Sequence, residues 1–95
     1  MNDLQVSCAG RRYSFEQNQV VRIGRSTDND VVVSDPTVSR QHARLVVQEG
    51  VCRIKDLGST NGTFLGSQQI DAEVDLPLGT PVALGKVVAV LTRRK

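Results

Sequence analysis

Residues 43–56 read ARLVVQEGVCRIKD, and this stretch decides the fold class. Apolar and polar side chains alternate with a period of two on both sides of Glu49-Gly50, which is typical of two β-strands joined by a tight turn. With those two residues as the turn, Leu45 lies opposite Ile54 and both fall on the apolar face. The pattern predicts a β-hairpin with one face packed on a core.

The same register has two consequences outside the core. Arg44 lies opposite Lys55, a like-charged pair that is tolerable only where solvent screens it. Beyond the strand ends, Ser39 and Thr60 also fall at matching positions. We therefore expect the loops that carry these two residues to leave the same end of the hairpin and to converge there.

The rest of the chain repeats the strand pattern. Further alternating or β-branched runs occur at residues 4–8, 13–15, 21–23, 31–33, 82–84 and 87–91. Phe64 and Ile70 are isolated apolar residues between the fourth and fifth of these runs. Clusters of Gly, Pro, Asn and Asp separate these runs, and no stretch has an apolar stripe at helical spacing. Many short strands with close turns predict an all-β sandwich or barrel, and residues 1–95 are expected to form a single domain.

Composition and charge exclude several classes of protein. The net charge of +2 is small, the basic residues are scattered, and aromatic residues make up only 3% of the chain. Nucleic-acid binders usually carry a basic stripe with aromatic stacking platforms, so nucleic acid is not an expected partner. No apolar run is long enough to span a bilayer, so membrane insertion is not expected either.

The two cysteines and the start of the chain bear on the cellular compartment. Cys8 and Cys52 fall at apolar positions of expected strands, where they act as small fillers. The first residues lack a charged-then-apolar leader. A disulfide between the two cysteines would need their Cα atoms within about 7 Å, and the sequence alone does not give that distance. The default expectation is a reduced, cytoplasmic protein.

Three separated segments share a chemistry that suits a phosphate group. They are Gly24-Arg25, Ser39-Arg40-Gln41-His42 and Ser59-Thr60-Asn61-Gly62-Thr63. Together they offer two guanidinium groups, several hydroxyls and a side-chain amide, with no carboxylate among them. A phosphorylated side chain carries roughly −1.5 to −2 charges and three acceptor oxygens. Arginine forks and short hydroxyl donors match that group.

In order and spacing, these three segments resemble the forkhead-associated (FHA) domain. The resemblance runs from Val20 to about Leu91 and includes Asp56-Leu57-Gly58 as well as the two Leu-Gly pairs near residues 79 and 85. It implies an antiparallel β-sandwich of two sheets and about eleven strands, like that of FHA and SMAD domains. It also implies a protein-interaction module that binds phosphothreonine through loops at one end, works in Ser/Thr kinase signalling and needs no cofactor.

The resemblance assigns roles to individual residues. It implies that Arg25 and Ser39 bind the phosphate, that Arg40 faces phosphate or peptide backbone, that Thr60 adds a contact near the phosphate, and that Asn61 hydrogen-bonds the peptide main chain. It implies structural support of the site by three further residues, namely Gly24, His42 and Gly62.

Each motif also has a less specific interpretation. Ser39, His42 and Asp56 could form a hydrolase triad, although Ser39 does not sit on the strand-to-helix elbow of such enzymes. Asn61-Gly62 alone signals a hairpin turn and, with Thr63, a glycosylation acceptor. Asp28-Asn29-Asp30 is interpreted as a turn held by side-chain-to-backbone bonds.

Metal binding and catalysis are not expected. The single histidine and the two cysteines lack the short ligand spacing of a zinc site.

The remaining alternative function, of a different class, is a phosphate-independent scaffold that assembles through a sheet face or an edge strand. Some FHA domains have a basic residue two positions before the serine, and this residue selects the peptide residue three places after the phosphothreonine. The present chain has Thr37 at that position. An acidic preference by that route is therefore not expected.

Overall fold

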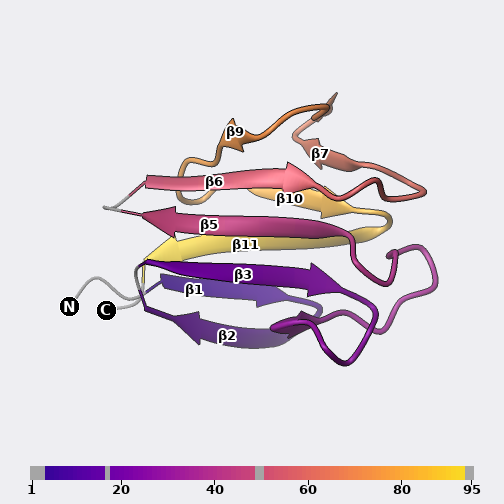
Figure 1. The fold of residues 1–95 in the computed structure, drawn as a ribbon, viewed down its shortest axis with the longest axis horizontal. Helices are drawn as coiled ribbons and strands as arrows, with labels where there is room; N and C mark the ends of the chain where they lie inside the picture. The colour runs from indigo at the N-terminus through magenta and orange to yellow at the C-terminus, as the bar shows by residue number, and fades with distance from the viewer. Residues whose placement is uncertain (1–3, 17, 49–50, 94–95) are drawn as a thin grey trace.

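The structure, a computed structural model, describes residues 4–16, 18–48 and 51–93. Across these residues the chain forms eleven strands and no helix (Figure 1). The strands are β1 (Leu4–Cys8), β2 (Arg11–Phe15), β3 (Gln19–Gly24), β4 (Val31–Val32), β5 (Ala43–Gln48), β6 (Val51–Asp56), β7 (Thr63–Leu65), β8 (Gln68–Gln69), β9 (Val74–Asp75), β10 (Pro81–Leu84) and β11 (Val87–Arg93). No helix in these ranges could cross a membrane.

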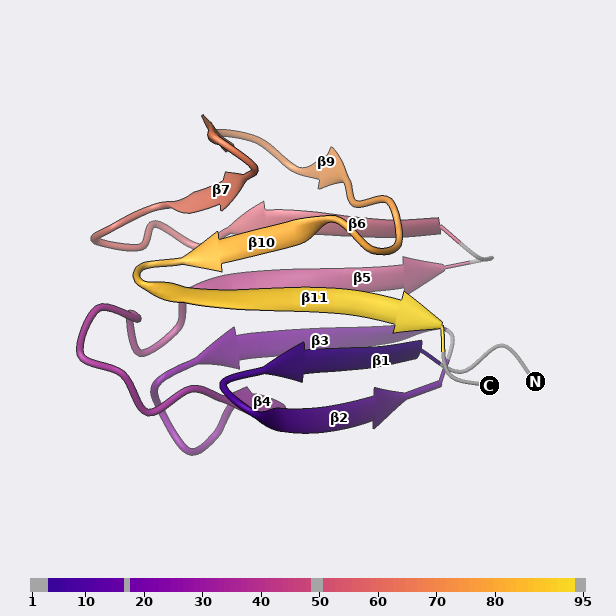
Figure 2. The same ribbon diagram turned by 180° about the vertical axis from the view of Figure 1, so that it is seen from behind.

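The strands form two sheets packed face to face, as the views from both sides show (Figures 1 and 2). The six-stranded sheet has the order β2-β1-β11-β10-β7-β8, and the five-stranded sheet has the order β4-β3-β5-β6-β9. Every pair is antiparallel except β3–β4, which is parallel. The expectation of an all-β sandwich of two sheets is confirmed, with this one short parallel pairing as the departure.

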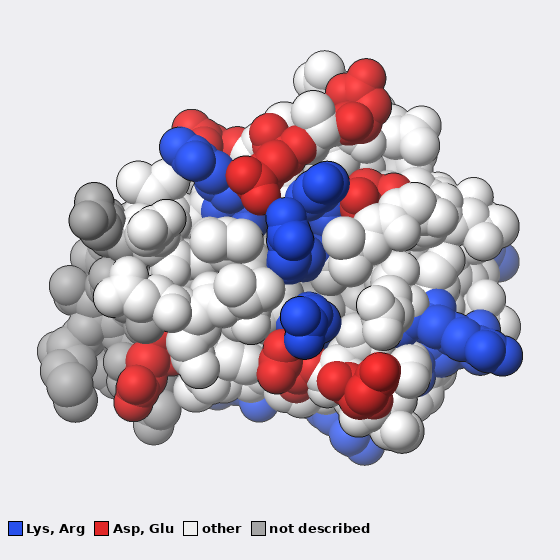
Figure 3. Space-filling view, viewed as in Figure 1, with Lys and Arg blue, Asp and Glu red and all other residues white. Residues whose placement is uncertain are grey.

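The hairpin register predicted from residues 43–56 is confirmed. Leu45 pairs with Ile54, and Arg44 pairs with Lys55, in the β5–β6 ladder. The expected turn residues Glu49 and Gly50 lie outside the described residues. Because successive side chains point to opposite faces, Arg44 and Lys55 lie on the outer face, where the charged residues of this sheet gather (Figure 3).

The structure decides two points that the sequence left open. The alternative interpretation of Asn61-Gly62 as a hairpin turn does not hold, because the strands that flank it, β6 and β7, belong to different sheets. Gly62, at a φ of 84°, instead ends the segment that carries the chain from one sheet to the other. Ile70, which the sequence suggested as part of a strand, is buried but lies just after β8. The short strand β9 follows, although no alternating pattern in the sequence predicts it.

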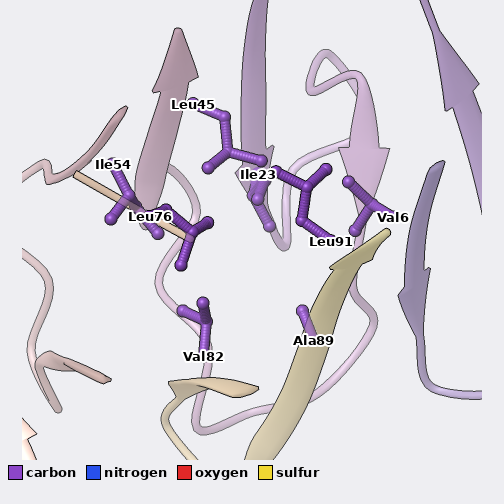
Figure 4. Close-up of a pocket in the computed structure, with 8 residues that line it drawn as sticks. All are labelled: Val6, Ile23, Leu45, Ile54, Leu76, Val82, Ala89 and Leu91. Carbon is purple, nitrogen blue, oxygen red and sulfur yellow. The ribbon is translucent and has the colours of Figure 1, made fainter. Parts of the chain in front are cut away.

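The core lies between the two sheets and is made almost entirely of aliphatic side chains. Figure 4 shows eight residues that surround its centre, from both sheets and from the segment after β9. They enclose a void of about 10 Å³ with an apolar lining. That is about the least space a single water occupies, and no polar group lines it, so the void is a packing defect rather than a ligand site.

Strand direction places five connections at one end of the sandwich. The β1–β2, β3–β4, β4–β5, β6–β7 and β10–β11 connections all lie at the right-hand end in Figure 1. The sheets thus act as a rigid frame, and the loops that carry the chemically interesting residues extend from one end of it.

Truncation of Ile54 tests this account of the core. The side chain lies on β6 of the five-stranded sheet and is fully buried. Ile54→Ala is expected to destabilise the domain by about 2–5 kcal/mol, and Ile54→Val by about 0.5–1.5 kcal/mol, because the larger truncation leaves the larger cavity. Urea denaturation measures both. Equal costs for the two variants would contradict the packing described here.

Candidate functional site

A cleft at the loop end of the sandwich collects all the residues that the sequence proposed as ligand-binding. Eight residues from three connections line it, and they are Arg25, Pro36, Thr37, Val38, Ser39, Arg40, Thr60 and Asn61. The expected convergence of the Ser39 and Thr60 loops is confirmed, since the Thr60 N–H donates to Ser39 Oγ at 3.0 Å. The β3–β4 loop, which the register argument did not reach, joins them at the same cleft.

Arg25 is fixed by the neighbouring loop. Its backbone N–H donates to the Ser39 carbonyl at 2.9 Å, and its Nε donates to the Val38 carbonyl at 3.0 Å. These bonds hold the stem of the side chain against the β4–β5 connection. Because Nε is already engaged, the two terminal nitrogens of the guanidinium are the donors left for a ligand.

The main chain beside Arg40 is also held tightly, while its side chain is exposed. The Arg40 carbonyl accepts from the side-chain amide of Asn29 at 2.7 Å and from the Ser26 N–H at 3.2 Å. A side chain on Gly24 would collide with that same carbonyl, so glycine is required there. The Asn29 amide also donates to the Ser26 carbonyl at 2.8 Å, which is the side-chain-to-backbone turn expected at residues 28–30.

His42 joins two of the three loops from a fully buried position. Its Nδ1 accepts from the Ser39 N–H at 3.1 Å, and its Nε2 lies 2.8 Å from the Gly62 carbonyl oxygen. Since Nδ1 accepts, the ring proton is assigned to Nε2, which donates to Gly62. The imidazole therefore fixes the distance between the Ser39 loop and the Asn61-Gly62 segment.

Asp56 organises the β6–β7 connection from within. Its carboxylate accepts from the backbone N–H groups of Gly58 and Ser59, both at 3.0 Å, and from the hydroxyls of Ser59 at 2.5 Å and Thr63 at 2.6 Å. Burial alone would raise the pKa of Asp56, but these hydrogen bonds outweigh it and lower the pKa below its usual value. The Ser59 hydroxyl in turn accepts from the Gly62 N–H at 3.0 Å.

Thr37 joins the Asn61 side chain on one side and the β10–β11 turn on the other. The Asn61 amide donates to the Thr37 carbonyl at 2.8 Å, and the Thr37 hydroxyl accepts from the Lys86 N–H at 2.9 Å. Thr37 also donates its hydroxyl and its N–H to Asp35. The short β10–β11 turn is thereby bonded to the loop that carries Ser39.

The supporting roles of Asp56 and Lys86, and the bond from Asn29 to the Arg40 carbonyl, were not found from the sequence. Asp56 was considered only as a member of a triad, although an Asp two or three residues before Gly58 and Ser59 is a recognisable signal of side-chain capping in a turn. The contact between Lys86 and Thr37 joins residues 49 positions apart and has no local signal.

The geometry does not support a hydrolase triad. Both ring nitrogens of His42 bond backbone groups, and the Asp56 carboxylate is occupied by the donors of its own loop. Ser39 Oγ accepts from the Thr60 N–H, and His42 bonds the backbone N–H of Ser39 rather than its hydroxyl. The arrangement lacks the Ser-to-His and His-to-Asp bonds that such catalysis needs.

Metal and thiol chemistry find no support in the part of the chain that the structure describes. No three His, Cys, Asp or Glu side chains in that part lie close enough to hold a metal ion. Cys8 and Cys52 are buried, free and located in different sheets. Burial raises the pKa of Cys52 to about 11 and also raises that of Cys8, so both thiols stay protonated and unreactive.

The chemistry of the cleft suits an anion. Among the described residues that line it, two are arginines, three carry hydroxyls and none is Asp or Glu. Most of the remaining polar groups of the loops are engaged with one another, so the cleft is shaped before a ligand arrives. Such a site binds a tetrahedral anion through arginine and hydroxyl donors.

Comparison with known proteins agrees with this geometry. The family model of the FHA domain matches residues 21–85. The FHA domain-containing protein FhaB of Mycolicibacterium smegmatis is 43% identical over 80 residues, which cover 84% of this chain and 51% of that protein. The chain thus spans about half the length of that relative.

Solved structures show the same fold. The FHA domain of the CT664 protein from Chlamydia trachomatis superposes with a TM-score of 0.93 at 25% identity, covering 98% of this chain and 99% of that chain. Mycobacterium tuberculosis EmbR, solved in complex with a low affinity phosphopeptide, gives a TM-score of 0.86 at 29% identity, covering 96% of this chain and 24% of that chain. The sandwich, the loop cleft and the match over residues 21–85 show that the chain belongs to the forkhead-associated (FHA) domain family.

Proposed function

We propose that this domain is a non-catalytic module that binds a phosphothreonine-bearing segment of a partner protein in the loop cleft. The observation that carries the proposal is the convergence of Arg25, Ser39 and Asn61 from three loops on one cleft without a carboxylate lining. Phosphopeptide binding by EmbR, a member of the same family, supports it.

Each lining residue has a role that fits its contacts. The terminal nitrogens of Arg25 and the hydroxyl of Ser39 bind the phosphate, and Arg40 adds charge at the rim of the cleft. Thr60 supplies a further hydroxyl near the phosphate. Asn61 uses one amide N–H to hold Thr37, which leaves its carbonyl oxygen and its second N–H for the peptide main chain.

Magnitudes indicate that such a site would work as a switch. A hydrogen bond to a charged group contributes roughly 1.5–3 kcal/mol. The loss of two such bonds on dephosphorylation would weaken binding by about a hundred- to ten-thousand-fold. A Ser/Thr kinase that phosphorylates the partner would therefore control the association.

The proposal extends to the setting of the domain. Residues 1–95 form one folding unit, the domain acts in the cytoplasm, and its partner is a protein phosphorylated by a Ser/Thr kinase. Neither a cofactor nor nucleic acid takes part. Both ring nitrogens of His42 are bonded to backbone groups rather than to the Ser39 hydroxyl, which supports a binding rather than a catalytic role.

Removal of the phosphate donors tests the proposal. Arg25→Ala and Ser39→Ala are each expected to weaken binding of a phosphothreonine peptide by about tenfold or more, because each removes a charge-assisted hydrogen bond. Isothermal titration with matched phosphorylated and unphosphorylated peptides measures the effect.

Arg12→Ala and Ser14→Ala are the matched controls, because both residues are exposed on β2, in the other sheet. They should bind like the wild type. Equal affinity of the wild-type domain for the two peptides would contradict the proposal and favour a phosphate-independent scaffold.

The support of the β6–β7 loop by Asp56 gives a second prediction. Asp56→Asn places an amide NH₂ where donors now converge, so one or more N–H groups lose their acceptor. We expect a loss of stability of about 1–3 kcal/mol and weaker phosphopeptide binding. Thermal unfolding and peptide titration of the same variant measure both effects, and an unchanged variant would contradict the role of the carboxylate.

The lowered pKa of Asp56 gives a third prediction, on pH. A carboxyl whose pKa is lower in the folded state stabilises the fold above its unfolded pKa of about 3.9, and this contribution is lost as the pH falls through the folded value. The stability difference between wild type and Asp56→Asn should therefore be constant near neutral pH and shrink below about pH 4. A difference that grows on acidification would contradict the assignment.

A further inference from the structure

Three cations stand side by side across the outer face of the five-stranded sheet. Arg22 of β3 pairs with Arg44 of β5, which pairs with Lys55 of β6, so the three residues lie directly opposite one another on adjacent strands. We name Arg22, Arg44 and Lys55 the cationic row. Figure 3 shows blue atoms that cross the middle of this face, over the three strands.

The row is only partly neutralised by the protein itself. Arg44 lies 3.6 Å from Glu73, and the neighbouring Arg53 lies 3.2 Å from Asp75. Asp30 also lies beside the row, since its carboxylate accepts from the backbone N–H of Arg22 at 2.9 Å. The guanidinium of Arg22 and the ammonium of Lys55 have no carboxylate within salt-bridge distance among the described residues. Like charges directly opposite on neighbouring strands repel one another. An anion laid across the row would remove that repulsion.

The row lies close to the loop cleft. Arg22 of β3 is three residues before Arg25, which directly follows the strand, and three extended residues span about 10 Å. Arg44 and Lys55 lie on the two strands that lead from Ser39 and to Thr60. A peptide anchored in the cleft would reach the row with about four extended residues.

We propose that the cationic row binds an acidic segment of the same partner protein, at least about five residues away from its phosphothreonine. This inference rests on the proposed function of the cleft and adds a second, electrostatic contact to it. The side chains of Arg22 and Lys55 are exposed, so a ligand can reach both. Arg44 lies between them on the middle strand and continues the positive charge from one to the other. The occupant is an acidic peptide, because the sheet face offers no aromatic side chain among its described outward residues for stacking nucleic-acid bases.

The test uses phosphothreonine peptides with two kinds of tail. One tail has a neutral Gly-Ser spacer of about four residues followed by about six alternating Asp and Glu residues, and the other has Gly-Ser throughout. Each tail is placed before the phosphothreonine in one pair of peptides and after it in another. Titrations are made at about 0.01 M and about 0.15 M salt, because exposed ion pairs are screened as the Debye length falls.

The acidic tail is expected to strengthen binding by about 3- to 20-fold at low salt on at least one side of the phosphothreonine, and by less at high salt. The double variant Arg22→Gln/Lys55→Gln should lose this gain and keep wild-type affinity for the neutral-tailed peptide. The double variant Arg11→Gln/Arg12→Gln, which removes the same charge from β2 of the other sheet, should keep the gain.

Amide chemical shifts locate the contact and separate the two proposals. The acidic tail should shift amides of β3, β5 and β6, and the unphosphorylated acidic peptide alone should shift the same amides at low salt. Three results would each overturn the inference. The gain in affinity could persist in the Arg22→Gln/Lys55→Gln variant, or the acidic tail could have no effect on the wild type. An oligothymidylate of equal charge could also bind more tightly than the acidic peptide. Loss of phosphate dependence with these shifts retained would contradict only the function of the cleft.

Discussion

The site depends on one buried imidazole that is hydrogen-bonded on both sides. His42 holds the Ser39 N–H through Nδ1 and the Gly62 carbonyl through Nε2, and these two groups belong to loops that are separate in the sequence. A ring that accepts on one side and donates on the other fixes both loops at a set distance. The Thr60 N–H then reaches Ser39 Oγ, and the Asn61 amide reaches the Thr37 carbonyl. The imidazole thus joins the two loops whose contacts shape the cleft.

Around this bridge, a second set of bonds satisfies the backbone of each loop. The Asp56 carboxylate accepts hydrogen bonds from the N–H groups of the β6–β7 connection, and the Asn29 amide donates to the Arg40 carbonyl. Buried polar groups are costly unless they are paired, so these side chains make irregular loops stable at the end of an aliphatic core. At the cleft, the terminal nitrogens of Arg25 are left for a ligand. A site formed in this way loses little conformational entropy when it binds, which suits a reversible switch.

Much of this could be predicted from the sequence, because the signals are local. The period-two pattern and the turn expected from the sequence were enough to predict the β5–β6 register, and that register brought Ser39 and Thr60 together. The parallel β3–β4 pair, strand β9 and the bond between Lys86 and Thr37 were not predictable, since they depend on how the two sheets pack. Asn61-Gly62 shows the limit of turn signals. A dipeptide that favours positive φ serves a hairpin or, as here, a crossing between sheets, and only the tertiary structure decides which.

The most direct measurement is a crystal structure of the domain bound to a phosphothreonine peptide. The account predicts a phosphate within hydrogen-bond distance of both Arg25 and Ser39, a peptide main chain that contacts Asn61, and a His42 ring whose two bonds are unchanged. A phosphate bound elsewhere on the sandwich, with the cleft between Arg25 and Asn61 empty, would contradict it.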